Sequence, residues 1–322
     1  MGRPRLDISS SLAVRVATLY YEDNKTHDDI GVMMGLSRWK VARILQHAKD
    51  VGIVKIHIIQ PTTRVETLEN HIREHFQLDT VIVVDTTGQT PLDAIGREAA
   101  NHVLELAPAI STLGMSWGKT LTAMANALPD GWAEGIGVVQ VNGGMSVLDT
   151  SHSASSTVAV VAGKARGHAH IMPTPAIVQL PETADALRMD PTVSSVLDLA
   201  HQSDTIMFTV GVASSDSAHV RSGYLTMDDI AQLREAGAVG DVVGRFIDAQ
   251  GYVVDADLDH RTIGISLENV LAAPRRILVA ESAAKAPAVM SCLRRGLVSS
   301  LVVDKELAHN LVVPSSLESD HA

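Results

Sequence analysis

The feature that most constrains the fold is an alternation, in residues 77–322, between short apolar runs and amphipathic stretches of helical length. Buried strands of a parallel sheet read as continuous apolar runs, and parallel neighbours need a crossover connection, usually a helix. The sequence therefore predicts a mostly parallel α/β sheet over these residues. The apolar runs are "TVIVVD", "AISTLG", "GVVQV", "DTIMFTVG", "RRILVAES" and "LVSSLVVD", and the main helical stretches are "TPLDAIGREAANHVLELA", "KTLTAMANAL" and "APAVMSCLRRG".

Polar and glycine-rich segments follow four of these predicted strands. In α/β sheets, ligands bind beyond the carboxyl ends of the strands, where glycines let the backbone approach the ligand. We therefore expect a binding site at this edge of the sheet. The four segments are Gly114–Thr120, Asn142-Gly143-Gly144, Gly211 with the Ser-rich loop after it, and Glu281–Lys285.

The segment "STLGMSWGKTL" (111–121) ends like a Walker phosphate-binding loop, but only three residues separate Gly114 from Gly118, and the Walker motif has four. We interpret it as a strand, a tight turn and a helix whose first N–H groups form an anion site, with Lys119 and Thr120 adding a charge and a hydroxyl. A phosphate-like group on a small sugar is favoured over a nucleotide and over a purely structural turn. The same residues match the Gly-x-Ser-x-Gly of a hydrolase, but no triad partners are evident.

Other candidates carry less weight. Asp241 stands between glycines and can accept hydrogen bonds from sugar hydroxyls, with a plain turn as the alternative. Lys285 stands at a predicted helix start, which is unfavourable for the helix dipole unless an anion is close by. A metal at His152, His168 and His170 is disfavoured because no carboxylate-rich partner motif is evident in the sequence. We expect neither a metal nor a cofactor.

The first 60 residues have the pattern of a DNA-binding head. Apolar residues at helical spacing predict one helix around residues 12–20, a short second helix that Thr26 caps and Gly35 ends, and a third that begins after Ser37. Two helices joined by a turn of about three residues match a helix-turn-helix, and the alternating "GIVKIHIIQP" after them is typical of a strand or wing. The alternative is a basic surface hairpin. The predicted DNA-binding residues, on the third helix or at the two caps, are Thr26, Ser37, Arg38, Trp39, Lys40 and Arg43; Trp39 is as easily a packing residue.

The charge distribution agrees with a separate head. The net charge is −11, yet residues 1–60 hold nine Lys and Arg against six Asp and Glu. Because residues 1–60 are basic and the rest of the chain is acidic, we expect only residues 1–60 to bind a polyanion. The chain has one cysteine, Cys292, and no signal-peptide or membrane-span pattern in its sequence, so we expect a cytoplasmic protein without a membrane partner.

The predicted domain boundaries follow from these patterns: residues 1–60 form a winged helix-turn-helix, residues 61–76 a linker or oligomerisation helix, and residues 77–322 an effector domain. In the middle segment, Val65, Leu68, Ile72 and Phe76 share one helical face, which we expect to pack on a neighbour, most simply the same helix of a second subunit. A protein that contacts only one DNA half-site binds weakly, so a homodimer or homotetramer is expected.

Over roughly residues 10–315 the sequence resembles the SorC-type (also called DeoR-like) family of sugar-binding bacterial transcriptional regulators. The motifs that carry this resemblance are "THDDIGVMMGLSRWKVARILQHAKDVGIVKI", "LGMSWGKTL", "VNGG", "GAVGDVVGRFIDAQG" and "AAKAPAVMSCLRRGLVSSLVVDKELA". The resemblance implies a winged helix-turn-helix and an effector domain related to hexosamine-phosphate deaminases and pentose-phosphate isomerases, with a phosphorylated sugar as inducer. One departure is Glu281-Ser282-Ala283-Ala284, where many relatives have glycines.

The resemblance also implies roles for individual residues. It places the phosphate near Ser116, Gly118, Lys119 and Thr120, with Lys285 closing on it and Asp241 near the sugar hydroxyls. The complete set of predicted effector-binding residues is Gly114, Ser116, Trp117, Gly118, Lys119, Thr120, Asn142, Gly143, Gly144, Gly211, Asp241 and Lys285.

The function expected from the sequence is a DNA-binding regulator of a carbohydrate-utilisation operon. Its partners are double-stranded operator DNA and a small phosphorylated sugar, or a related sugar or polyol. The alternative is a sugar-phosphate isomerase or deaminase with an appended DNA-binding head, although no general base and second acid can be assigned from the sequence. A pure protein-interaction module would explain neither the third helix nor the glycine-rich strand ends.

Overall fold

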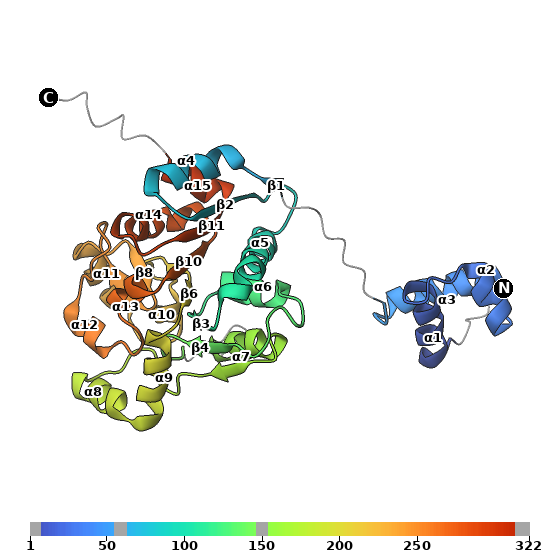
Figure 1. The fold of residues 1–322 in the computed structure, drawn as a ribbon, viewed down its shortest axis with the longest axis horizontal. Helices are drawn as coiled ribbons and strands as arrows, with labels where there is room; N and C mark the ends of the chain where they lie inside the picture. Colours follow the sequence, from blue (N-terminus) through green and yellow to red (C-terminus); the bar gives the residue numbers. More distant parts are fainter. Residues whose placement is uncertain (1–7, 55–62, 146–153, 313–322) are drawn as a thin grey trace. The chain divides into compact units, whose positions relative to one another are not determined.

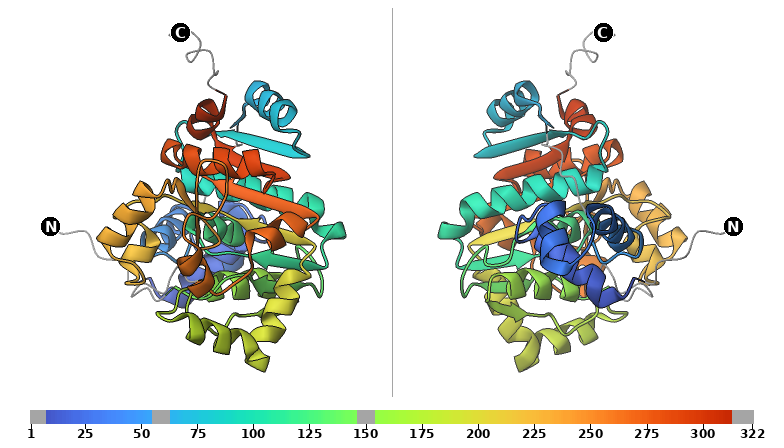
Figure 2. Two further views of the ribbon diagram at one scale, coloured as in Figure 1. Left: turned by 90° about the vertical axis from the view of Figure 1, so that its left-hand side faces the viewer. Right: turned by 90° about the vertical axis from the view of Figure 1, so that its right-hand side faces the viewer.

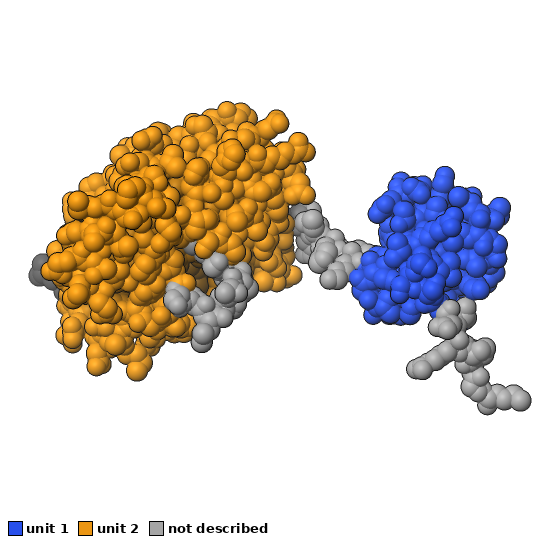
Figure 3. Space-filling view, turned by 90° about the horizontal axis from the view of Figure 1, so that it is seen from below, with its two compact units in different colours: residues 1–61 blue, residues 62–322 orange. Residues whose placement is uncertain are grey.

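The chain divides into two compact units, residues 1–61 (unit 1) and 62–322 (unit 2), coloured separately in Figure 3. A computed structural model describes residues 8–54, 63–145 and 154–312. The described part of unit 1 contains the helices α1 (Ser10–Tyr21), α2 (His27–Met34) and α3 (Arg38–Asp50).

The helices of unit 1 begin and end where the sequence predicts. Thr26 and Asp29 form a capping box at the start of α2, and Gly35 ends α2 in the left-handed conformation with φ 66°. Ser37 caps α3 by accepting a hydrogen bond from the Lys40 N–H. Residues 35–37 therefore form a short turn between α2 and α3, and the three predicted helices are confirmed.

The core of unit 1 is small and contains one apolar face from each helix. Val16 of α1, Ile30 of α2, and Val41 and Ile44 of α3 are all fully buried. The segment predicted as a strand or wing, residues 52–61, lies outside the described residues from residue 55 onward.

Unit 2 is built on an eight-stranded sheet with the order β1-β2-β11-β10-β6-β3-β4-β5. Its pairings are parallel except for the edge pair β1–β2, so the predicted mostly parallel α/β sheet is confirmed. The strands are β1 (Thr63–Arg64), β2 (Thr80–Asp85), β3 (Thr112–Met115), β4 (Gly137–Gln140), β5 (His168–His170), β6 (Thr205–Phe208), β10 (Arg275–Ala280) and β11 (Ser300–Asp304).

Consecutive strand residues of this sheet face two separate apolar cores. In β6, for example, Ile206 and Phe208 belong to one core and Met207 to the other. Helices cover both faces, as Figure 1 shows, and the side views show α5, in teal, lying along the sheet (Figure 2). The core that contains Met207 is covered by α5 (Pro91–Leu106), α6 (Lys119–Ala127) and α7 (Ala154–Lys164), and the other by α4 (Glu66–Phe76), α8 (Pro181–Met189), α9 (Pro191–His201), α13 (Leu267–Ala272), α14 (Ala286–Arg295) and α15 (Lys305–Leu311).

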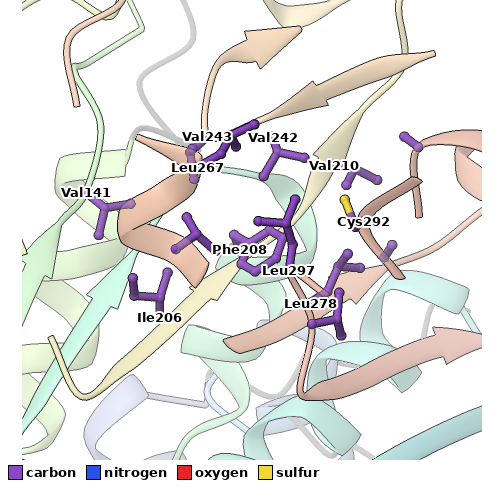
Figure 4. Packing of buried hydrophobic residues seen from close by; sticks show 14 of the residues in the cluster. Val141, Ile206, Phe208, Val210, Val242, Val243, Leu267, Leu278, Cys292 and Leu297 are labelled. Carbon is purple, nitrogen blue, oxygen red and sulfur yellow. The ribbon is translucent and has the colours of Figure 1, made fainter. Parts of the chain in front are cut away.

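A second, three-stranded antiparallel sheet has the order β7-β8-β9 and was not predicted. Its first strand follows β6 after one residue, Thr209, so the chain passes directly from one sheet to the other. Phe208 packs where the two sheets meet, and Figure 4 shows Val210, Val242 and Leu297 around it. The remaining elements are β7 (Val210–Gly211), β8 (Gly240–Val242), β9 (Arg245–Ile247), α10 (Ala218–Arg221), α11 (Met227–Glu235), α12 (Ala256–Arg261) and the short 3₁₀ turns η1 (Ala107–Ala109) and η3 (Ala283–Lys285).

The helix predicted as a separate linker, residues 61–76, requires a correction. A short strand, β1, precedes it, and the helix itself, α4, begins at Glu66. Ile72 is fully buried in a core of unit 2, and Val65, Leu68 and Phe76 pack against the same core. The apolar face that was expected to meet another subunit is therefore covered by the chain's own sheet, and α4 is part of unit 2.

Over the residues described, the helices are too short or too polar to span a lipid bilayer.

The position of Ile72 generates a prediction about stability. Ile72→Ala deletes a fully buried side chain and should lower the free energy of unfolding of unit 2 by about 2–5 kcal/mol. Met189→Ala, at a side chain that is 82% exposed in the same unit, is the control and should change it by less than about 0.5 kcal/mol. Urea unfolding followed by circular dichroism measures both. Equal stabilities would mean that α4 is not packed on the sheet.

Candidate effector-binding site

The sheet of unit 2 contains a point at which the chain reverses its direction of travel across the strands. From β3 the chain proceeds to β4 and β5 on one side, and from β6 it proceeds to β10 and β11 on the other, while β3 and β6 are direct neighbours. Connections that leave two neighbouring strands in opposite directions open a crevice at their carboxyl ends, which is the usual ligand site of α/β sheets.

A cavity of about 590 Å³ lies at this reversal point. Its volume is within the range of small-molecule sites. The cavity is lined by segments that follow β3, β4, β6 and β10 and by the β8–β9 hairpin. The lining residues are Ser116, Trp117, Gly118, Lys119, Thr120, Asn142, Met145, Thr209, Val210, Gly211, Val212, Ser214, Asp216, Ser217, Ala218, Arg221, Asp241, Val243, Gly244, Glu281 and Lys285.

The turn between β3 and α6 presents backbone N–H groups to this cavity. The Ser116 N–H donates to the Met207 carbonyl at 3.1 Å, which ties the turn to β6. Gly118 adopts φ 153°, and a Cβ there would lie 2.5 Å from Cγ2 of Thr209. No side chain caps the N-terminus of α6, which begins at Lys119. Its first N–H groups and the helix dipole are therefore available to an anion.

Two lysines add positive charge to the cavity wall. Lys119 is exposed, and Lys285 is half-buried on η3. Burial lowers the pKa of Lys285, and the carboxylates of Glu281 and Asp241 oppose that effect. By contrast, the Thr120 hydroxyl donates to the Val279 carbonyl at 3.3 Å, so it anchors α6 to β10 in addition to lining the cavity.

Three lining residues have buried polar atoms without a hydrogen-bond partner among the described residues. They are the indole Nε1 of Trp117, both side-chain amide atoms of Asn142, and the hydroxyl of Thr209. Buried polar atoms are nearly always paired in proteins, and leaving one unpaired costs roughly 1–3 kcal/mol. Such atoms are suited to hydrogen-bond a polar ligand or water in the cavity.

Asp241 lies in β8 opposite Gly211 of β7 and is almost completely buried. A Cβ at position 211 would lie only 1.9 Å from Oδ1 of Asp241, so the carboxylate can occupy this place only because residue 211 is glycine. The predicted Gly211 and Asp241 are therefore brought together in one wall of the cavity.

Three predicted effector-binding residues do not line the cavity. Gly114 lies within β3, where a Cβ would approach Cγ1 of Val141 at 2.8 Å. Gly143 and Gly144 donate their N–H groups to the carbonyls of Ile263 and Thr174. At positions 114 and 143, glycine allows close packing against neighbouring chain, and all three residues lie outside the cavity lining.

Several lining residues were missed by reasoning from sequence. Thr209 lies two residues before Gly211, Val243 lies two residues after Asp241, and Arg221 follows the Ser-rich loop. Arg221 belongs to α10, a helix of four residues that leaves no periodic signal. Its guanidinium contacts the side chain of Asp216 at 3.1 Å.

The segment Glu281-Ser282-Ala283-Ala284 keeps a glycine-like backbone despite having no glycine. Ser282 adopts φ 84°, and its N–H donates to Oδ2 of Asp304 at 2.5 Å. A non-glycine residue in this region is strained, and such strain is found where neighbouring structure enforces it. Glu281 lines the cavity, so this segment adds a carboxylate to the wall that also contains Lys285.

The predicted DNA-binding residues lie on the surface of unit 1. Arg38 and Arg43 are exposed on α3, and Trp39 is 82% exposed, so it does not pack within the described part of this unit. Arg38 forms an exposed ion pair with Asp28 at 3.6 Å. The Thr26 hydroxyl donates to Asp29 at 2.7 Å, which a phosphate contact would have to displace. Ser37 and Lys40 lie at the start of α3.

Two of the histidines considered for a metal, His168 and His170, belong to the edge strand β5 and do not line the cavity. The third, His152, lies outside the described residues. In the described ranges, His, Cys, Asp and Glu side chains nowhere form a metal-binding group of three or more.

Comparison with known proteins identifies the family. Residues 60–313 match the Sugar-bind family, described as "Putative sugar-binding domain". The chain is 30% identical over 306 residues to the uncharacterized transcriptional regulator YjhU of Escherichia coli, covering 91% of this chain and 92% of that protein. It is 27% identical over 306 residues to the deoxyribonucleoside regulator of Bacillus subtilis, covering 94% and 97%.

A solved structure shares the fold over nearly the whole chain. The full-length sorbitol operon regulator SorC of Klebsiella pneumoniae aligns with a TM-score of 0.72 and 22% identity, over 96% of this chain and 99% of that one. The chain therefore belongs to the SorC/DeoR-type family of sugar-binding bacterial transcriptional regulators.

Proposed function

We propose that this protein is a transcription factor whose affinity for operator DNA is controlled by a small phosphorylated sugar or polyol bound in the cavity of unit 2. The observation that carries the proposal is the composition of the cavity wall. An uncapped helix N-terminus and two lysines line the same cavity as buried polar side chains that have no partner among the described residues. An anionic group can bind to the helix N-terminus and the lysines, and hydroxyl groups can hydrogen-bond to the buried polar side chains.

The names of related regulators support a carbohydrate ligand. One relative is the erythritol catabolism regulatory protein EryD of Brucella abortus, and another is the sorbitol operon regulator of Klebsiella pneumoniae. The proposed ligand for this chain is a molecule of the same chemical class, phosphorylated because the cavity offers cationic and N–H donors at the start of α6.

Unit 1 is proposed to be a winged helix-turn-helix, with α3 lying in the major groove. The N-terminal residues of such a helix contact base edges, and here they are Arg38, Trp39, Lys40 and Arg43. The exposure of Trp39 favours a DNA contact over a packing role. The phosphate anchors are proposed to be Ser37 and Thr26, at the caps of α3 and α2.

Ligand and DNA are proposed to be coupled through assembly of a homodimer or homotetramer in the cytoplasm. Occupancy of the cavity would change how the effector domains pack and hence how the heads are spaced on the operator. A coupling free energy of about 1–3 kcal/mol corresponds to a change of about 5- to 150-fold in DNA affinity. The effector domain is further proposed to be related to sugar-phosphate isomerases and deaminases but not to catalyse their reactions.

Arg43 provides the test of the DNA-binding role. Arg43→Ala removes an exposed guanidinium that can donate to guanine, and should weaken binding to a duplex selected from a random pool by about 5- to 150-fold. Lys49→Ala, a cation exposed in the last turn of the same helix, is the matched control and should have a much smaller effect. Fluorescence anisotropy measures both affinities. An equal loss of DNA affinity in the two variants would show that the first turns of α3 do not contact DNA.

Lys119 provides the test of the ligand-binding role. Lys119→Ala should weaken binding of a phosphorylated sugar by about 10- to 150-fold, since hydrogen bonds to charged groups contribute roughly 1.5–3 kcal/mol. DNA binding without ligand should be retained. Calorimetric titration with free and phosphorylated pentoses, hexoses and polyols measures the affinity.

The matched control for Lys119 is Arg234→Ala, an exposed cation at the end of α11 that does not line the cavity. It should bind the same compounds as the unmodified chain. Unchanged binding by Lys119→Ala would remove the α6 turn from the site. Turnover of any sugar phosphate by the purified protein would favour the enzyme alternative instead.

A further inference from the structure

A buried histidine lies next to Asp241, one of the acidic residues that line the cavity. His219, on α10, is completely buried and is not among the residues that line the cavity. Its Nε2 lies 3.4 Å from Oδ2 of Asp241, whose side chain is 6% exposed. Neither ring nitrogen is in a hydrogen bond with a described residue, so the Nε2–Oδ2 approach is an ion-pair contact, and the donor capacity of Nε2 is still available to Asp241. His219 therefore contacts Asp241 from the side away from the ligand space.

The ring of His219 is held in place by two aromatic neighbours. Its centroid lies 5.5 Å from the ring of Trp117, in an edge-on arrangement, and 5.2 Å from the ring of Phe246. The His219 backbone carbonyl accepts hydrogen bonds from the N–H groups of Tyr224 and Leu225. The imidazole is consequently fixed between the β3–α6 turn and the β8–β9 hairpin.

The carboxylate of Asp241 is confined from two directions. Oδ1 lies against the Cα of Gly211, and Oδ2 faces His219. An ionised carboxylate only accepts hydrogen bonds, and each oxygen has two lone pairs. A donor from behind would occupy part of this capacity and hold the group rigid, and the remaining lone pairs can face the cavity that Asp241 lines.

We propose that His219 is a positioning residue: its Nε2–H donates to Asp241 and fixes the carboxylate as the acceptor for one hydroxyl of the effector. This inference rests on the proposed function, because it needs a polyhydroxyl ligand in the cavity. A site built to hydrogen-bond a particular hydroxyl rejects the analogue that lacks it, because a buried acceptor is then left unpaired. His219 thereby contributes to the choice between sugars although it does not touch them.

The first test needs no ligand. Nitrogen-15 NMR of the labelled full-length chain, with His219→Gln identifying the signal, shows which ring nitrogen carries a proton. A proton on Nε2, in the neutral or the charged ring, is expected. A neutral ring protonated at Nδ1 would overturn the proposal, because Nε2 could then not donate to Asp241.

The second test measures ligand discrimination by His219→Leu. The probes are inorganic phosphate, ribose 5-phosphate, fructose 6-phosphate and sorbitol 6-phosphate, with deoxy analogues of the last three, titrated by calorimetry. His219→Leu should lower the affinity for the sugar or polyol phosphate that binds by about 10-fold. The unmodified chain should bind this compound more tightly than its deoxy analogues, and in His219→Leu the largest of these affinity ratios should fall to about twofold or less. Affinity for inorganic phosphate should stay within about twofold, and His219→Gln, which keeps an N–H donor, should preserve the preference.

The matched control is His102→Leu, in α5. His102 is also buried, with neither ring nitrogen in a hydrogen bond, but it lies outside the cavity lining. It should leave the ligand preference unchanged. Equal weakening of phosphate and sugar phosphate by His219→Leu, or a parallel effect of His102→Leu, would assign His219 a purely structural role. If no sugar phosphate binds the unmodified chain, the proposed function fails while the NMR result still decides the contact with Asp241.

Discussion

The pairing of β3 with β6 is the constraint on which the rest of unit 2 depends. These two parallel strands are neighbours in the sheet but not in the sequence, and the chain leaves them in opposite directions. The hydrogen bond from the Ser116 N–H to the Met207 carbonyl extends the pairing up to the turn that begins α6. Because that pairing brings the turn and the Thr209 segment together, it creates the cavity and directs an uncapped helix N-terminus into its wall.

The apolar cores beneath the cavity stabilise features that would be unfavourable on their own. Phe208 and its neighbours Val210 and Val242 pack where the two sheets meet (Figure 4). In the cavity lining, Val243 adopts φ 47°, which is unusual for a β-branched residue, and Trp117, Asn142 and Thr209 have polar atoms without a partner in the part of the chain that the structure describes. Strain and unpaired groups gathered at one place are typical of a binding site rather than of a core.

The sequence predicts those parts of the structure that are encoded locally. Caps such as Thr26 and Ser37 and the apolar strands lie where they were expected, because each depends on a few adjacent side chains. Two kinds of feature were not predictable. Strands of two or three residues, such as β7, are too short to show alternation. His219 reaches Asp241 only through the tertiary fold.

Glycine shows the same limit, because sequence alone does not distinguish a glycine that faces a ligand from one that allows close packing. Gly118 and Gly211 line the cavity, whereas Gly114 and Gly143 lie against neighbouring backbone and side chains. The apolar face of α4 has a similar ambiguity, since the pattern shows that it is buried but not whether its partner is the same chain or another.

The most direct measurement of the central claim is the affinity of the unmodified chain for its operator, determined with and without each sugar phosphate that stabilises the protein against heat. At least one such compound is expected to change the dissociation constant of the DNA complex by about 5- to 150-fold. A compound that fills the cavity, with an operator affinity that stays constant at saturation, would contradict it.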